Sequence, residues 1–327
     1  MAFFGTPEIA LPTLEGLMAS RHEVACVVSQ PDRGRGRGRQ RSPSPVSALA
    51  LDRDIPLLRS EQVGDSESLN FLETHRPDIG VVVAFGQFIP KRIRELPRLG
   101  YLINAHASLL PRHRGASPIQ TAILSGDETT GISVMKVERE MDAGAVALTR
   151  AIQIDPKENT AELTARLGAL AAEAILDTVE EIAQQKVSWT EQDVELATYA
   201  PRIEKNDGRL DWRMTTGVLT RKIRAFSPKP GAFTSLPATD KTEGDWLRIL
   251  EAESVECPQQ SSQPPGTLHL DDANRRTPLW IATGDGWLAP LRVQRSGGKV
   301  METSAFLRGY AIQEGQRFGE DAEQPNE

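Results

Sequence analysis

The stretch IGVVVAF, residues 79–85, is the clearest indication of how this chain folds. It is a short apolar run dominated by β-branched valine, and Pro77, Asp78 and Gly86 mark its two ends. Runs of this length and composition are typical of strands that are buried on both faces of a parallel sheet. The stretch therefore predicts a central strand of such a sheet.

Further apolar runs lie on both sides of this stretch, and helical patterns separate them. Strands are expected at residues 3–4, 24–28, 101–103 and 132–137, and helices at residues 9–18, 67–74 and 118–124. This alternation predicts an α/β fold with an open, mostly parallel sheet over about the first 150 residues. Ligands of such a sheet bind beyond the carboxyl ends of its strands, where the strand order reverses.

The remainder of the chain has a different pattern. Apolar residues recur every three or four positions between Thr160 and Lys186, which predicts one long helix. After Trp212 come short strand-like segments and a Gly-Asp-Gly turn, which predict a small β barrel resembling an oligonucleotide-binding (OB) fold. We therefore expect a first domain at 1–186, a linker at 187–208, a barrel at 209–318 and a disordered acidic tail at 319–327.

Composition excludes several classes of protein. The 327 residues are 39% hydrophobic and contain no apolar run near the roughly 18 residues that span a membrane, nor a basic-then-apolar leader. We expect a cytoplasmic monomer with no membrane partner. The net charge of −7 argues against a protein that coats DNA indiscriminately, and we expect no DNA partner. Cys26 and Cys257 form no C-x-x-C pair, so the sequence supports neither a disulfide framework nor a zinc site.

The motifs of dinucleotide and nucleoside triphosphate binding are missing. The first strand runs into Gly5 and then a helix, which suits an anion, but the turn lacks G-x-G-x-x-G. The run of arginine and glycine at residues 33–39 also lacks that spacing and the Lys-Ser/Thr of a phosphate-binding loop.

Polar side chains that suit catalysis lie in INAHASLLPRHRG, residues 103–115. Asn104 and His106 are two positions apart at a strand end, so both side chains project from one face. An amide donor beside an imidazole stabilises negative charge on an oxygen and exchanges a proton near neutral pH. Asp142 follows another predicted strand and would orient His106. A hydrogen-bonded strand end and an ordinary Asp turn explain the same residues, and the spacing does not decide between these interpretations.

These stretches together resemble the 10-formyltetrahydrofolate-dependent formyltransferases. The resemblance covers nearly the whole chain and is carried by FFGTPEIALPTLEGL (3–17), VVVAFGQFIP (81–90), residues 103–135, MDAG (141–144), RLDW (209–212) and IRAFSPKPGAFT (223–234). It implies the Rossmann-like formyltransferase fold and a catalytic centre of Asn104, His106 and Asp142. It also implies that the formyl group moves from N10 of the folate co-substrate to an amine, without a metal.

The resemblance also implies where the folate binds. The expected residues are Ser108, Leu109, Leu110 and Pro111 in one loop and Phe85, Gly86 and Gln87 in another. Apolar side chains would flank a flat heterocycle, and backbone groups would bind its polar edge. The chain departs from the usual family pattern at His113, Ala143, Ala145 and Lys229, so details of the pocket are left open.

The stretch PDRGRGRGRQRSPSP, residues 31–45, places five arginines in nine residues: Arg33, Arg35, Arg37, Arg39 and Arg41. Alternating arginine and glycine bury no core, so we expect a mobile loop. Arginine pairs with phosphates bidentately. Family members that formylate the methionine carried by the initiator tRNA have a matching insertion, so the resemblance implies that these arginines contact Met-tRNA.

Two other functions remain open. An enzyme that formylates a small amine, such as an amino sugar or a ribonucleotide, would keep the catalytic residues but would not need the barrel or the arginines. An RNA-binding module with a degenerate catalytic fold would keep the basic segments but would not need Asn104, His106 and Asp142.

Overall fold

The computed structural model describes residues 1–35, 40–237, 245–256, 263–271 and 273–319. These residues form two compact units. The N-terminal unit comprises Met1–Ile119, Glu128–Ile154 and Leu163–Pro201, and the C-terminal unit comprises Gln120–Asp127, Asp155–Glu162 and the chain from Arg202 onward. No helix in the described ranges is both long and apolar enough to cross a membrane.

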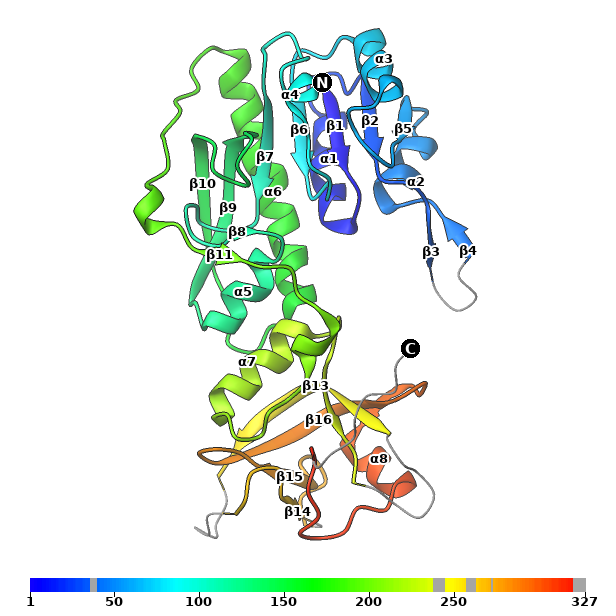
Figure 1. Cartoon of the computed structure of the whole chain (residues 1–327), viewed down its shortest axis with the longest axis vertical. Coiled ribbons are helices and arrows are strands. Elements are labelled where there is room, and N and C mark those ends of the chain that lie inside the picture. The colour runs from blue at the N-terminus through cyan, green and yellow to red at the C-terminus, as the bar shows by residue number, and fades with distance from the viewer. Residues whose placement is uncertain (36–39, 238–244, 257–262, 272, 320–327) are drawn as a thin grey trace. The chain divides into compact units, whose positions relative to one another are not determined.

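The N-terminal unit is built on a sheet whose described strands run in the order β10-β9-β7-β6-β1-β2-β5 (Figure 1). The strands are β1 (Ala2–Gly5), β2 (Cys26–Ser29), β5 (Leu57–Arg59), β6 (Gly80–Val83), β7 (Leu102–His106), β9 (Thr129–Lys136) and β10 (Val146–Gln153). Strands β5, β2, β1, β6 and β7 pair in parallel, whereas β9 and β10 are antiparallel. The predicted open, mostly parallel sheet is therefore confirmed.

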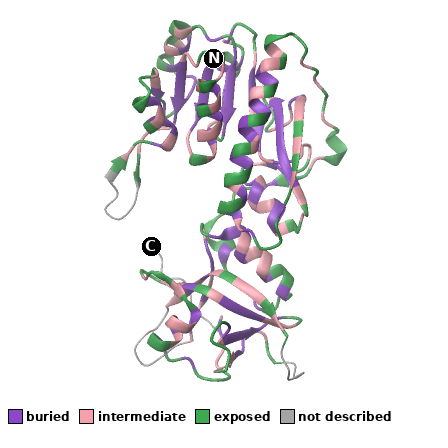
Figure 2. Ribbon diagram, turned by 180° about the vertical axis from the view of Figure 1, so that it is seen from behind, coloured by how far each residue is buried: buried purple, intermediate pink, exposed green. Residues whose placement is uncertain are grey.

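Helices cover this sheet, and Figure 2 shows its central strands buried. The helices of this unit are α1 (Leu11–Ala19), α2 (Pro45–Asp52), α3 (Ser66–His75), α4 (Lys91–Arg94) and most of α6 (Thr160–Ala183). Helix α5 (Pro118–Ser125) belongs mostly to the C-terminal unit. Local signals start two of them, because the side chains of Ser44 and Asp65 accept hydrogen bonds from the backbone N–H groups of Ser47 and Ser68. The helices expected at 9–18, 67–74 and 118–124 and the long one after Thr160 are all present.

The connections place several loops at one edge of the sheet. Strand β1 lies between β6 and β2, so the strand order reverses beside β1. The carboxyl ends of β1, β6 and β7 meet at this edge, because these strands are parallel. This is where a sheet of this kind binds its ligands. Val82 of β6 lies opposite Asn104 of β7, so the loops after both strands begin side by side.

The C-terminal unit contains an antiparallel sheet in the order β12-β13-β16-β15-β14, with β17 paired to β16. Its strands are β12 (Ala232–Ser235), β13 (Trp246–Val255), β14 (Leu268–Leu270), β15 (Leu279–Ala282), β16 (Trp287–Arg295) and β17 (Val300–Glu302). This agrees with the predicted small barrel. Helices α7 (Thr216–Phe226) and α8 (Thr303–Gly309) were not predicted, and α7 contributes buried Leu219 and Ile223 to the core of the unit.

The arginine-rich segment differs from the loop expected from its composition. Strand β3 (Arg33–Arg35) pairs in antiparallel register with β4 (Gln40–Ser42), so the flanks of the segment form a two-stranded ribbon. Pairing satisfies backbone N–H and C=O groups even where no side chain is buried. Arg33 and Arg41 are exposed. Arg37 and Arg39 lie outside the described residues, as do Cys257 and residues 320–327 of the predicted tail.

Candidate active site

Strand β7 carries Asn104 and His106 to the ligand-binding edge of the N-terminal sheet. It lies between β6 and β9, and its last residue, His106, is opposite Ser133 of β9. Because side chains alternate along a strand, Asn104 and His106 project from the same face. Asn104 is half-buried, whereas His106 is only 6% exposed. The strand therefore presents an amide and an almost enclosed imidazole together.

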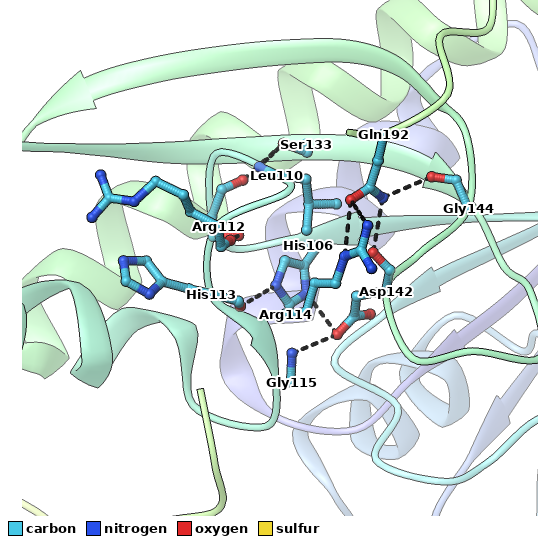
Figure 3. Close-up of polar contacts among 11 residues, drawn as sticks. His106, Leu110, Arg112, His113, Arg114, Gly115, Ser133, Asp142, Gly144 and Gln192 are labelled. Atoms are coloured by element: carbon cyan, nitrogen blue, oxygen red, sulfur yellow. Dashed lines mark hydrogen bonds and ion pairs between the residues drawn. The ribbon is translucent and has the colours of Figure 1, made fainter. Parts of the chain in front are cut away.

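Two oxygen atoms fix the imidazole of His106 (Figure 3). The Nε2 atom lies 2.9 Å from the carbonyl oxygen of His113, and Nδ1 lies 3.4 Å from Oδ2 of Asp142. A carbonyl oxygen only accepts hydrogen bonds, so Nε2 is the donor in its contact with His113. The structure thus places the imidazole and the carboxylate in contact, with only 14% of the Asp142 side chain exposed.

Asp142 is itself held in a defined place. Its backbone is left-handed, with a φ of 54°, a conformation in which Asp is found more often than most residues. Its Oδ2 atom accepts a hydrogen bond of 2.9 Å from the backbone N–H of Gly115. The carboxylate is therefore fixed between the loop after β7 and the imidazole.

Gln192 connects this carboxylate-bearing loop to a buried arginine. Its Nε2 atom donates to the carbonyl oxygens of Asp142 and Gly144, at 2.8 Å each. Its Oε1 atom accepts from Nε and Nη2 of Arg114, at 3.1 and 2.8 Å. Arg114 is 4% exposed. Gln192 was not predicted as a site residue, because it lies in the polar segment at 187–208 that we expected to be a linker.

The loop expected to bind folate is shaped by hydroxyl groups. The Ser108 side chain is fully buried, and its Oγ donates to the carbonyl oxygen of Arg112 at 2.6 Å. Ser133 on β9 donates to the carbonyl oxygen of Ser108 at 2.8 Å and accepts from the N–H of Leu110 at 3.0 Å. Ser108 and Ser133 thus fix the loop from inside, whereas Leu109, Leu110 and Pro111 are half-buried at its surface.

The second expected folate-binding segment follows β6. The Phe85 ring is 2% exposed and belongs to the core of the unit. The side chain of Gln87 donates to the carbonyl oxygen of Ser60 at 2.7 Å and accepts from the N–H of Val63 at 2.8 Å. Gly86 is exposed, with a φ of 77°. This segment therefore presents backbone to solvent, and the Phe85 ring supports it from behind.

His113, one of the positions at which the chain departs from the family pattern, contacts the imidazole of His106. His113 is 6% exposed and left-handed, with a φ of 58°, and it contributes the carbonyl oxygen that fixes His106. Its backbone N–H donates to Oγ1 of Thr198, at 2.9 Å. Ala145 is buried, and Lys229 is exposed in the C-terminal unit. Over the described ranges, no group of three or more histidine, cysteine or acidic side chains is placed to hold a metal.

Comparison with known proteins gives matches over the whole length. The family model for formyl transferase matches residues 1–179, and that for the formyl transferase C-terminal domain matches residues 202–311. The chain is 40% identical to a methionyl-tRNA formyltransferase of Methylococcus capsulatus, over 98% of this chain and 99% of the relative. It is 37% identical to that of Geobacter sulfurreducens, over 97% and 96% of the two chains. Among solved structures, the sugar 3N-formyl transferase WlaRD has a similar fold, with a TM-score of 0.62, 16% identity, and coverage of 88% of this chain and 96% of that one.

Proposed function

Because the chain belongs to the formyl transferase family, we propose that it transfers a formyl group from 10-formyltetrahydrofolate to the free amine of methionine esterified to the initiator tRNA. One observation carries this conclusion. A relative called methionyl-tRNA formyltransferase is 40% identical to this chain over 98% of its length, a range that includes the C-terminal unit. Transferases of small amines share the fold at 16% identity, which is a likeness of architecture alone.

We infer that the residues at the sheet edge fit the folate co-substrate. The half-buried side chains of Leu109, Leu110 and Pro111 offer an apolar flank, and the exposed backbone at Gly86 offers polar groups beside it. Sites for flat, polar-edged ligands combine these two features. When bound, 10-formyltetrahydrofolate supplies the formyl carbon, attached to its N10 atom.

Asn104 and His106 have the chemistry to stabilise the transfer. Negative charge develops on the formyl oxygen as the amine attacks, and preorganised N–H donors lower the energy of that charge. The Nε2–H of His106 is bonded to the His113 carbonyl at 2.9 Å, which orients the ring. Its Nδ1 contact with Asp142, at 3.4 Å, is longer than an ordinary N–H···O hydrogen bond, so this N–H is the one that we assign to the formyl oxygen, together with the Asn104 amide.

Asp142 has two tasks in this proposal. Its Oδ2 atom accepts from Gly115 and faces the imidazole, which keeps the carboxylate beside the ring. We assign to its other oxygen, Oδ1, the proton that the attacking amine loses. That proton then reaches the departing N10, so the formyl carbon exchanges one nitrogen for another and no net proton is consumed. The step needs no metal ion.

We assign tRNA recognition to the arginine-rich ribbon and to the barrel domain at residues 209–318. Arg33 and Arg41 are exposed on the ribbon, and the guanidinium group of arginine pairs with phosphates through two hydrogen bonds. We propose a cytoplasmic location, because the proposed tRNA substrate is used there when translation starts. That the protein is a monomer without DNA or membrane partners stays a prediction.

A comparison of acceptors tests the proposed function. The full chain is incubated with 10-formyltetrahydrofolate and Met-tRNA, free methionine, an amino-sugar nucleotide or an aminoribonucleotide. Mass spectrometry then identifies formylated products, after alkaline release of methionine from tRNA. We expect product with Met-tRNA. Faster formylation of a small amine would favour the second enzyme class, and the absence of product with every acceptor would leave an RNA-binding module.

A further inference from the structure

The catalytic assignment gives no role to Gln192, whose side chain bonds to the backbone of Asp142. We propose that Gln192 is a positioning residue for the proposed formyl transfer: it couples buried Arg114 to the loop of Asp142 and so keeps the carboxylate beside His106 (Figure 3). This inference rests on the proposed function for its activity assays, and on the structure alone for the contacts.

A single amide makes both halves of the connection. Its oxygen accepts from two nitrogens of Arg114, at 3.1 and 2.8 Å. Its nitrogen donates to two carbonyl oxygens, of Asp142 and Gly144, at 2.8 Å each. The amide oxygen thus accepts from two atoms of one residue, and the amide nitrogen donates to two residues.

The chemistry of these partners selects glutamine. A guanidinium group only donates hydrogen bonds, and carbonyl oxygens only accept them, so the connecting side chain must accept at one end and donate at the other. Glutamate keeps the length and strengthens the contact with Arg114, but its second oxygen would face two carbonyl oxygens. Alanine removes both contacts and leaves polar groups of a half-buried site without them.

The position of Gln192 explains why a change of its side chain would displace Asp142. Three consecutive residues hold both members of the catalytic pair. The His113 carbonyl fixes the imidazole, the Gly115 N–H fixes the carboxylate, and Arg114 between them fixes the backbone of Asp142 through Gln192. Residues 114–115 form strand β8, which pairs with β11 (Tyr199–Ala200), so this support is itself part of a sheet.

Gln192→Glu is the principal test, because glutamate keeps the contact with Arg114 and loses the hydrogen bonds to the carbonyl oxygens of Asp142 and Gly144. A displacement of a catalytic group by about 1 Å costs up to about 100-fold in rate, so we expect kcat to fall about 10- to 100-fold. The KM values for both substrates should stay within about twofold, and the melting temperature within a few degrees, since no apolar packing changes. Gln185→Glu makes the same change in charge at an exposed position of the same unit and should retain full activity. A Gln192→Glu enzyme with normal kcat would overturn the proposal.

A double-mutant cycle separates positioning from general support. If Gln192 acts through Asp142, Gln192→Ala should slow the wild-type chain but have little further effect in the Asp142→Asn chain. If the two residues acted independently, the fold losses in rate of the two single variants would multiply in the double variant. That outcome would contradict the proposal even if both single variants are slow.

A spectroscopic measurement distinguishes failure of this inference from failure of the proposed function. The ¹⁵N chemical shifts of the His106 ring report its contact with Asp142 without any turnover. We expect them to change in Gln192→Glu and not in Gln185→Glu. Unchanged ring shifts would refute the positioning role, whereas a wild-type chain that makes no formylmethionyl-tRNA would refute the proposed function and leave the ring result to stand by itself.

Discussion

The loop after β7 and the arginine ribbon are both polar segments of the N-terminal unit, but they are held in opposite ways. At the end of β7 and in the loop after it, His106, Ser108, His113 and Arg114 are buried. His106 and Ser108 bond to carbonyl groups of the loop itself, and His113 and Arg114 bond to Thr198 and Gln192, which are distant in sequence. In the ribbon, β3 and β4 pair with each other, and Arg33 and Arg41 are exposed. Chemistry requires fixed geometry, whereas recognition of a phosphate backbone requires accessible charge. The contrast predicts that changes in the loop affect kcat and that changes in the ribbon affect KM.

The largest effect is expected from His106→Ala. Loss of a donor that stabilises negative charge on the reacting oxygen typically costs about 10²- to 10³-fold in rate, and we expect kcat to fall within that range. The loss should be independent of salt, because the missing group contacts the reacting atoms. Steady-state formylation at two salt concentrations measures this. Near-normal turnover by a folded His106→Ala protein would remove His106 from the mechanism.

Gly115→Ala should disturb the loop without removing a catalytic group. Gly115 has a φ of 126°, and an added Cβ would lie 2.4 Å from the carbonyl oxygen of Ala200. The backbone must shift, and with it the N–H that holds Asp142, so we expect kcat to fall by up to about 100-fold.

Gly100→Ala is the matched control for this change. Gly100 also has a positive φ, of 76°, but an added Cβ would meet nothing within 4 Å. Both variants should lose stability, by about 1–3 kcal/mol for the unfavourable backbone. The free energy of unfolding, measured by chemical denaturation, and kcat together separate the loss of stability from the loss of catalysis. Equal losses of kcat in the two variants would contradict a specific role for residue 115.

Neutralising three arginines of the arginine-rich segment at residues 31–45, in what we call the ribbon variant, should have a smaller effect, of a different kind. In a chain with Arg35→Gln, Arg37→Gln and Arg39→Gln, we expect KM for Met-tRNA to rise about tenfold while kcat stays nearly normal. The slope of log affinity against log salt should become shallower by about 0.7–0.9 for each lost phosphate contact. Glutamine at the exposed positions Arg21, Arg53 and Arg98 gives the same change of net charge elsewhere. Salt dependence identical to that of this control would contradict the assignment.

Cys26 takes no part in turnover. The reactivity of its thiol reports whether the Gly115→Ala substitution or the ribbon substitutions disturb the sheet as a whole. Burial raises the pKa of its thiol to about 12, above the ordinary value near 8.5 to 9. The thiol therefore stays protonated in the folded chain through pH 9 and ionises only as the pH approaches 12, whereas unfolding restores its ordinary acidity. In a Cys257→Ser chain, iodoacetamide at pH 8 should label Cys26 very slowly until the protein unfolds. Fast labelling of the Gly115→Ala or ribbon variants would show that their effects are not local.

The sequence predicted the parts of this molecule that depend on local pattern. Buried runs such as residues 79–85 and the spacing of Asn104 and His106 on one strand face follow from periodicity, and the structure has both. The resemblance to the family is carried by stretches over nearly the whole chain, residues 103–135 among them, and agrees with the matching domains. The ribbon was not predicted, because its pairing depends on backbone hydrogen bonds rather than on buried side chains.

The supports of the site could not be predicted, because they depend on long-range contacts. Gln192 and Thr198 lie in a segment that has no apolar period, yet both bond to the loop after β7. The inward orientation of Ser108 and Phe85 likewise depends on Ser133 and on the core, not on their own neighbours in sequence. Whether Leu109, Leu110 and Pro111 contact folate stays a prediction.

Single-turnover formylation of Met-tRNA, with the enzyme in excess and its concentration varied, tests the division between chemistry and recognition most directly. The account predicts that His106→Ala lowers the maximal rate at least about 100-fold without changing the enzyme concentration that gives half of it. It predicts the reverse for the variant with glutamine at positions 35, 37 and 39. A normal maximal rate for His106→Ala, or a ribbon variant whose maximal rate falls while its half-saturating concentration is unchanged, would contradict it.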